Sequence, residues 1–136
     1  MIKTYNPKQV TMALGTHIVT GYADDSFISI EPSGDGITKK VGCDGEICRS
    51  ISPDDTSVIK LTVLQTSETN SFLQKKLKHD IQTGEGMFPI LIKDLKGGMV
   101  FSADAAWAVR SAPRGFGKES TNREWEIHTG SSNLEE

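Results

Sequence analysis

The sequence predicts a mainly β fold, an antiparallel barrel or sandwich of about eight strands with one short packed α-helix. Three observations support this prediction. Short runs of alternating apolar and polar residues recur along the chain. Turn signals separate these runs, and the chain contains 13 glycines. One segment, at about residues 68–81, has the apolar spacing of an amphipathic helix.

Composition limits the class of protein further. We expect a single domain over residues 1–136, because a chain of this length can bury a core of its own. The hydrophobic content of 36% favours a stranded protein with large solvent-facing or partner-facing surfaces. The net charge of −3 argues against a dedicated nucleic-acid binder. We find no signal peptide and no apolar run long enough for a membrane span, so no membrane partner is expected.

The first third of the chain predicts an arm followed by short strands. Residues 1–8 form the expected N-terminal arm. Residues 9–14 alternate and residues 17–20 follow a turn, which predicts either a strand pair or one bulged strand. A further strand is expected at 26–31, closed by the loop 32–36.

A hairpin is predicted over residues 37–51. Asp44-Gly45 is a strong signal for a two-residue type I′ turn, which needs positive φ at both central residues. In that register Cys43 faces Glu46 and Val41 faces Cys48, so the two thiols lie diagonally and a disulfide would be strained. We therefore expect reduced thiols, and two cysteines without a second ligand pair predict no metal site.

The strand that follows, at residues 57–66, is expected to be half-buried. Its polar face holds Lys60 and Thr62. Its apolar face holds Ile59, Leu61 and Val63. Such alternation is typical of a sheet with one face on a core and the other on water.

The predicted helix, at about residues 68–81, needs the sheet for its stability. Ser67 or Thr69 can cap its first turn, and Gly84 suits the position after its last turn. Leu73, Leu77 and Ile81 form its apolar stripe. A helix this short must dock that stripe on the sheet to be stable.

The last third predicts three more strands. Residues 88–93 form one, with Pro89 indicating an edge or a first position. Residues 99–110 form the next, bent or bulged near Ala103. The final strand begins after the predicted loop at residues 111–122 and ends near Thr129. Residues 130–136 are expected to be a polar tail.

No motif for catalysis or for a cofactor is found. The histidines, His17, His79 and His128, have no ligand-like spacing, and no nucleophile-elbow motif occurs. Residues 114–118 lack the spacing of a phosphate-binding loop. The sequence therefore predicts neither an enzyme nor a cofactor.

Several segments resemble one family, the tail tube proteins of contractile-tailed phages and related prophage-like particles. The similarity runs over roughly residues 6–128 in the same order. Its segments are residues 41–50 (VGCDGEICRS), 64–73 (LQTSETNSFL), 94–98 (DLKGG), 105–107 (AAW) and 123–125 (REW).

The resemblance implies a fold shared with the inner tube of type VI secretion systems. Hexameric rings would stack into a hollow tube inside a contractile sheath, through which DNA passes into the host. The implied partners are other copies of the chain, the tail sheath protein, and tape-measure and baseplate proteins. The implied location is the virion tail, assembled in the bacterial cytoplasm.

The resemblance also implies where subunits touch. The hairpin region is expected to reach neighbouring rings. The arm and the loop 111–122 are too polar and irregular to fold alone, so we expect them to order against a neighbouring subunit. The expected contact residues are Asp44, Gly45, Glu46, Arg49, Pro53, Asp54, Asp55, Tyr5 and Arg114.

Lys60 and Thr62 are expected to face the lumen of the tube, where a neutral-to-acidic wall avoids binding DNA phosphates. The alternative hypothesis is a small β-barrel adaptor of the baseplate or a tail terminator. Such a binding module would form one closed ring and would not polymerise.

Overall fold

The computed structural model describes residues 1–136 and contains ten strands and one α-helix. All strand pairs are antiparallel, as predicted. The elements are η1 (Pro7–Gln9), β1 (Val10–Leu14), β2 (His17–Ile18), β3 (Ile28–Pro32), β4 (Ile37–Val41), β5 (Ile47–Ile51), β6 (Ser57–Leu64), α1 (Glu68–Thr83), β7 (Phe88–Asp94), β8 (Met99–Ala108), β9 (Asn122–Thr129) and β10 (Ser132–Glu135).

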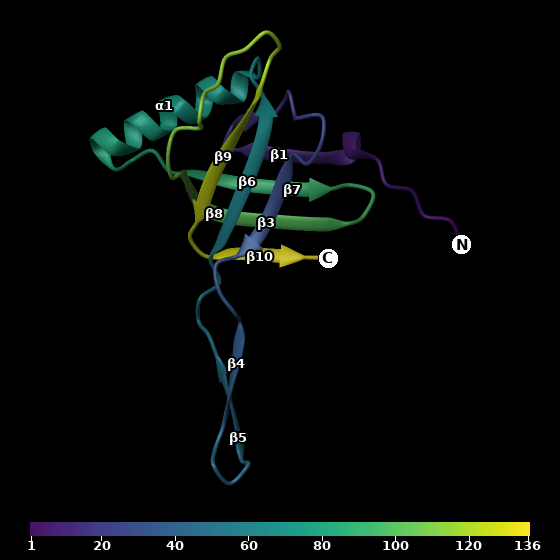
Figure 1. Cartoon of the computed structure of the whole chain (residues 1–136), viewed down its shortest axis with the longest axis vertical. Helices are drawn as coiled ribbons and strands as arrows, with labels where there is room; N and C mark the ends of the chain where they lie inside the picture. The colour runs from purple at the N-terminus through teal and green to yellow at the C-terminus, as the bar shows by residue number, and fades with distance from the viewer.

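The main sheet folds over into two crossed layers. Strands β3, β6 and β9 cross β1, β7, β8 and β10 at a steep angle (Figure 1). β8 belongs to both layers, because it pairs with β10 near its start and with β9 near its end. Its register against β7 shifts between the pairs Ile90–Ala103 and Phe88–Ala106. This irregularity confirms the bulge predicted near Ala103, and bulges let a strand turn from one layer into another.

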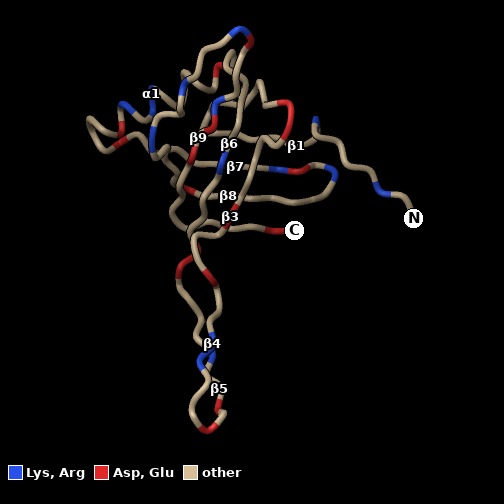
Figure 2. Tube along the Cα trace, in the orientation of Figure 1, with Lys and Arg blue, Asp and Glu red and all other residues tan.

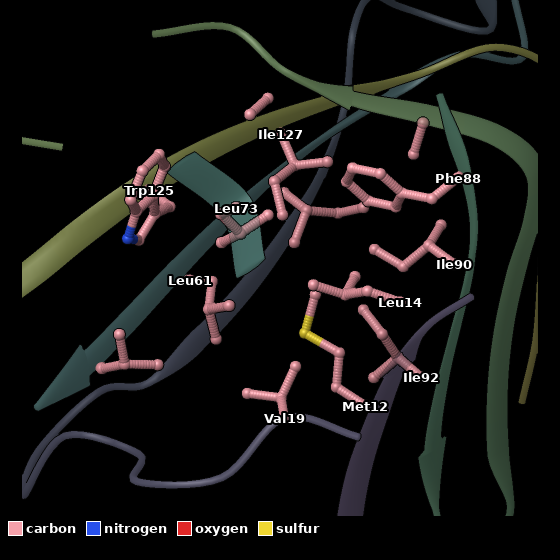
Figure 3. Close-up of a cluster of buried hydrophobic side chains, with 14 of the residues drawn as sticks. Met12, Leu14, Val19, Leu61, Leu73, Phe88, Ile90, Ile92, Trp125 and Ile127 are labelled. Carbon is pink, nitrogen blue, oxygen red and sulfur yellow. The ribbon is translucent and has the colours of Figure 1, made fainter. Parts of the chain in front are cut away.

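The core lies between the layers and draws side chains from both (Figure 3). The alternation predicted for β6 is confirmed: Ile59, Leu61 and Val63 are fully buried. On the other face of β6, Lys60 is exposed and Thr62 is half-buried. Trp125 and Ile127 continue the buried row on β9.

Helix α1 begins and ends as its sequence predicts, but its apolar stripe is shorter. The Ser67 hydroxyl caps the first turn, and Gly84 follows the last with φ of +74°. Leu73 and Leu77 are buried, whereas Ile81 is 76% exposed. The prediction that Ile81 docks on the sheet is wrong, because the C-terminal end of α1 extends past the strands (Figure 1).

A buried amide fixes the start of α1. The Asn70 side-chain nitrogen donates to the carbonyl oxygens of Leu64, Gln65 and Ser67, at 3.0 to 3.2 Å. Its oxygen accepts a 2.9 Å hydrogen bond from the Trp125 indole nitrogen. The amide therefore joins the end of β6, the first turn of α1 and the core face of β9.

Two details of the C-terminal half differ from the prediction. β7 lies between β1 and β8, so Pro89 is not on an edge strand. It is the second residue of β7 and lies at the register shift, where the ladder is interrupted and a missing N–H can be tolerated. The expected polar tail contains β10, whose backbone pairs with the free side of β8.

Candidate assembly interface

The hairpin of β4 and β5 projects from the body along the long axis of the molecule (Figure 1). It forms a separate two-stranded sheet, and all of its residues are exposed. Because it packs on nothing in its own chain, the hairpin is the strongest candidate for a contact surface.

The turn at its tip differs from the predicted type I′ turn. Gly45 N donates to Gly42 O at 2.9 Å, and Gly42 N donates to Glu46 O at 2.8 Å. Gly45 has φ of +88°, but no non-glycine residue in the chain has positive φ, so Asp44 does not meet the type I′ requirement. The result is a three-residue loop, stabilised by the Asp44 carboxylate, which accepts from Glu46 N at 3.1 Å.

The longer loop changes the partner of each cysteine. Cys48 lies opposite Lys40, and Cys43 lies in the loop, so the expected pairings of Cys43 with Glu46 and of Cys48 with Val41 are both wrong. Both thiols are free and exposed.

One face of the hairpin is apolar at both ends and cationic in the middle. Ile37 lies opposite Ile51, and Val41 lies opposite Ile47. Between these pairs, on the same face because side chains alternate, Lys39 lies opposite Arg49. Arg49 is among the contact residues expected from the sequence, whereas these four aliphatic residues are not. Their alternation, in strands with no packing partner, was the signal that could have found them.

At the base of the hairpin, the two aspartates form contacts within the chain. The Asp54 carboxylate accepts from the Thr56 hydroxyl at 2.6 Å and from Thr56 N at 3.0 Å. These bonds, the hydroxyl first, lower the pKa of Asp54 below its usual range. Asp55 accepts from Ser131 Oγ and Ser132 N, which ties the base to the start of β10. Pro53, between the hairpin and these residues, is exposed.

The remaining expected contact residues lie far from the tip. Arg114 belongs to the loop between β8 and β9, at the opposite end of the long axis (Figure 1), and donates to Gln74 and Ser111 beside α1. Tyr5 belongs to the N-terminal arm and is exposed. The structure therefore brings together Asp44, Gly45 and Glu46, but not Tyr5 or Arg114 with them.

The outer face of the β3–β6–β9 layer carries charges of both signs (Figure 2). Lys60 lies opposite Glu126, and Thr62 lies opposite Glu124. Glu126 also forms an ion pair with Arg110 at 3.0 Å. Glu31 adds another carboxylate on this face, and His128 lies 3.4 Å from Glu126, so three glutamates share the face with Lys60, Arg110 and a histidine. Whether this face lines a lumen stays a prediction.

A groove that the sequence analysis missed lies where the two layers diverge. It has a volume of about 520 Å³ and is lined mainly by apolar side chains from β3 on one side and from β1, β7, β8 and β10 on the other. Tyr5 of the arm lies beside it. Only the folded sheet brings these strands together, so no local pattern indicates the groove.

The structure gathers no group of three or more His, Cys, Asp or Glu residues that could hold a metal ion. It also has no helix long and apolar enough to cross a membrane.

A two-stranded ribbon is marginally stable by itself, and free strand edges can pair with another chain, so the projecting hairpin and the open edges of the sheet are candidates for contact with other subunits. The chain belongs to a family of phage structural proteins. It is 30% identical over 132 residues to structural protein ORF10 of Pseudomonas phage KPP10, covering 91% of this chain and 76% of that protein. No model of a protein family matches the sequence.

Solved structures of contractile systems share the fold. A chain in the cryo-EM structure of the anti-feeding prophage tube-terminating cap matches with a TM-score of 0.67, 12% identity, and coverage of 99% and 93% of the two chains. A chain of the sheath/tube terminator of the extracellular contractile injection system PVC matches with a TM-score of 0.67 and 10% identity. The match covers 99% of both chains. A chain of the PVC sheath–tube complex matches with a TM-score of 0.62 and 12% identity. The match covers 97% of this chain and 91% of that chain.

The resemblance to phage tail proteins is thus confirmed at the level of a phage structural protein with the fold of contractile-system components. The narrower assignment, to the main tube subunit, stays a prediction.

Proposed function

We propose that this chain is a tail terminator, a subunit of one closed ring at the end of the tube of a contractile phage tail. The observation that carries this proposal is the fold match over 99% of the chain to two terminator assemblies, at a TM-score of 0.67 in each case. The relationship to a phage structural protein supports a structural role in a phage particle, which both a terminator and a tube subunit have. The projecting hairpin supplies a surface through which copies can join.

A second candidate is the stacked subunit of the tube itself. The match to a chain of a sheath–tube complex, with a TM-score of 0.62, favours it. In this proposal hexameric rings stack around a channel for DNA, and Lys60 and Thr62 face that channel. The three glutamates near Lys60 suit a wall that must not hold DNA phosphates.

The two proposals share most of their partners. The chain contacts other copies of itself and, in the particle, the tube and the tail sheath protein. The tape-measure and baseplate proteins belong to the proposed tube form. DNA passes without specific binding, and the location is the virion tail.

Negative-stain electron microscopy of the purified chain over a range of concentrations separates the two candidates. A terminator gives annular particles of one thickness at every concentration above that needed for assembly. A tube subunit gives stacks that lengthen as the concentration rises. Particles that remain monomeric at all concentrations would contradict both.

Labelling of intact particles tests the same choice in the assembled state. Antibody against the chain, followed by gold particles, should mark a single end of the tail for a terminator. Label along the length of the exposed tube in contracted tails would instead favour the stacked subunit.

A further inference from the structure

The apolar face of the hairpin lacks a cover within its own chain. Ile37, Val41, Ile47 and Ile51 are 54%, 58%, 64% and 79% exposed, and they share one face of the ribbon. An isolated two-stranded ribbon is marginally stable in water unless a face packs on something else. The ribbon therefore needs a partner surface that buries this face.

The middle of the same face needs an acidic partner. Lys39 and Arg49 lie directly opposite one another, and like charges in that position are unfavourable. Neither forms an ion pair within the chain. The nearest acids in the ribbon, Asp44 and Glu46, lie in the turn beyond the strand pairing. A carboxylate from outside the ribbon would offset this repulsion.

The groove between the layers has matching properties. Phe27, Ile28 and Ile30 form one wall, and the other wall is also mainly apolar. Its charged lining residues are both acids, Asp25 and Asp94, and no lysine or arginine lines it.

The groove also ends in unpaired strands. β3 pairs only with β6, and β10 pairs only with β8. Each strand therefore leaves one edge of backbone groups free beside the groove, and such edges favour pairing with another chain.

We propose that the hairpin of one copy lies in the groove of the next copy. Its aliphatic residues would cover the groove, with Lys39 and Arg49 next to Asp25 and Asp94. A chain cannot fill its own groove in this way, because its hairpin points away from the body (Figure 1). This inference rests on the proposed ring: hairpin and groove are different surfaces, so the contact runs head to tail and can close a ring.

Charge reversal tests the contact. In the variant Lys39→Glu/Arg49→Glu, like charges would face Asp25 and Asp94, and association should weaken by about ten-fold or more. Adding Asp25→Lys to the same chain should restore much of the loss. Asp25 is exposed and forms no ion pair, so this change should leave the fold intact. Mass photometry and negative stain measure the fraction of chains in rings.

Lys40→Glu is the matched control, because Lys40 lies on the opposite face of the same ribbon, paired with Cys48. It should leave association within about two-fold of the wild type, since exposed charges outside a contact contribute little. Thermal unfolding at concentrations too low for assembly should show the same midpoint for all variants, because the hairpin contributes no buried residue to the monomer.

The outcomes separate this contact from the proposed function. Wild-type rings that tolerate the double reversal, or that are weakened equally by Lys40→Glu, would overturn the contact and leave the ring proposal standing. A wild-type chain that forms no ring at any concentration would overturn both. Loss with the double reversal and recovery with Asp25→Lys would support the contact.

Discussion

At the scale of single residues, Asn70 links more of the fold than any other polar side chain. Its amide bonds to three carbonyl oxygens and to the Trp125 indole, and both residues are buried. When a buried polar group loses its hydrogen-bond partner, the folded state is destabilised by the full desolvation free energy of that group. The first turn of α1 therefore depends on this side chain as well as on the Ser67 cap.

Asn70→Ala should lower the free energy of unfolding by about 2–3 kcal/mol, because it leaves the Trp125 N–H and several carbonyls without a partner. Chemical denaturation of the monomer measures this loss. Ser71→Ala, at an exposed neighbouring position, is the control and should change stability by less than about 0.5 kcal/mol. Equal stability of the two variants would show that the network contributes little.

Asp54 should titrate below the ordinary range of an aspartate, since the Thr56 hydroxyl and N–H both donate to its carboxylate. A depressed folded-state pKa makes a stabilising contribution that is present above the ordinary pKa and is lost as pH falls through the folded pKa. NMR titration of the Asp54 carboxyl group measures this pKa directly. Thr56→Val should raise the pKa of Asp54 towards its usual value, whereas Thr56→Ser should keep it low.

At the scale of elements, the hairpin and the main sheet obey different rules. The main sheet buries one face of each layer, and its register follows from that burial. The hairpin has no buried residue, and its register is set by the loop at its tip. Substitutions in the hairpin therefore leave the packing of the core unchanged. Its side chains are free to form contacts with a partner.

Excision of the hairpin should separate folding from assembly. Replacing Ile37–Ile51 with Asn-Gly joins two positions that already meet, because Ser52 N donates to Gly36 O at 2.8 Å. The shorter loop should leave unfolding free energy unchanged or raise it by about 1 kcal/mol. Calorimetry measures this, and electron microscopy should show no rings. A large loss of stability would mean that the hairpin supports the body.

At the scale of the whole molecule, hairpin and groove are separate surfaces, so each copy can both give and receive a contact. Such head-to-tail contacts produce a ring when the rotation between copies closes, and an open filament when it does not. The two proposed functions share this contact and differ in whether rings then stack on one another.

A copy without its hairpin should act as a chain end, because it can receive a hairpin but cannot give one. Mixing the excised variant with wild type before assembly should thus reduce closed rings and leave short open oligomers. Mass photometry of a series of mixing ratios follows both species. Closed rings that include the excised copies in proportion to their abundance would contradict head-to-tail contact through the hairpin.

The sequence by itself determined the mainly β class, the burial of β6, the caps of α1 and the bulge in β8. These features depend on neighbours in the chain: side-chain alternation, capping hydroxyls and glycine at positive φ. It also predicted the hairpin, but not its loop, because Asp44-Gly45 suits more than one turn and only the backbone shows which φ angles are adopted.

Only the tertiary structure decided where the sheet turns over, that β10 pairs with β8, that Ile81 lies beyond the sheet, and that a groove opens beside β3. Each of these depends on strands far apart in the sequence meeting in space. Local patterns specify which face of an element is apolar, but they do not specify what covers that face. In this protein the uncovered faces, on the hairpin and in the groove, are the ones we assign to assembly.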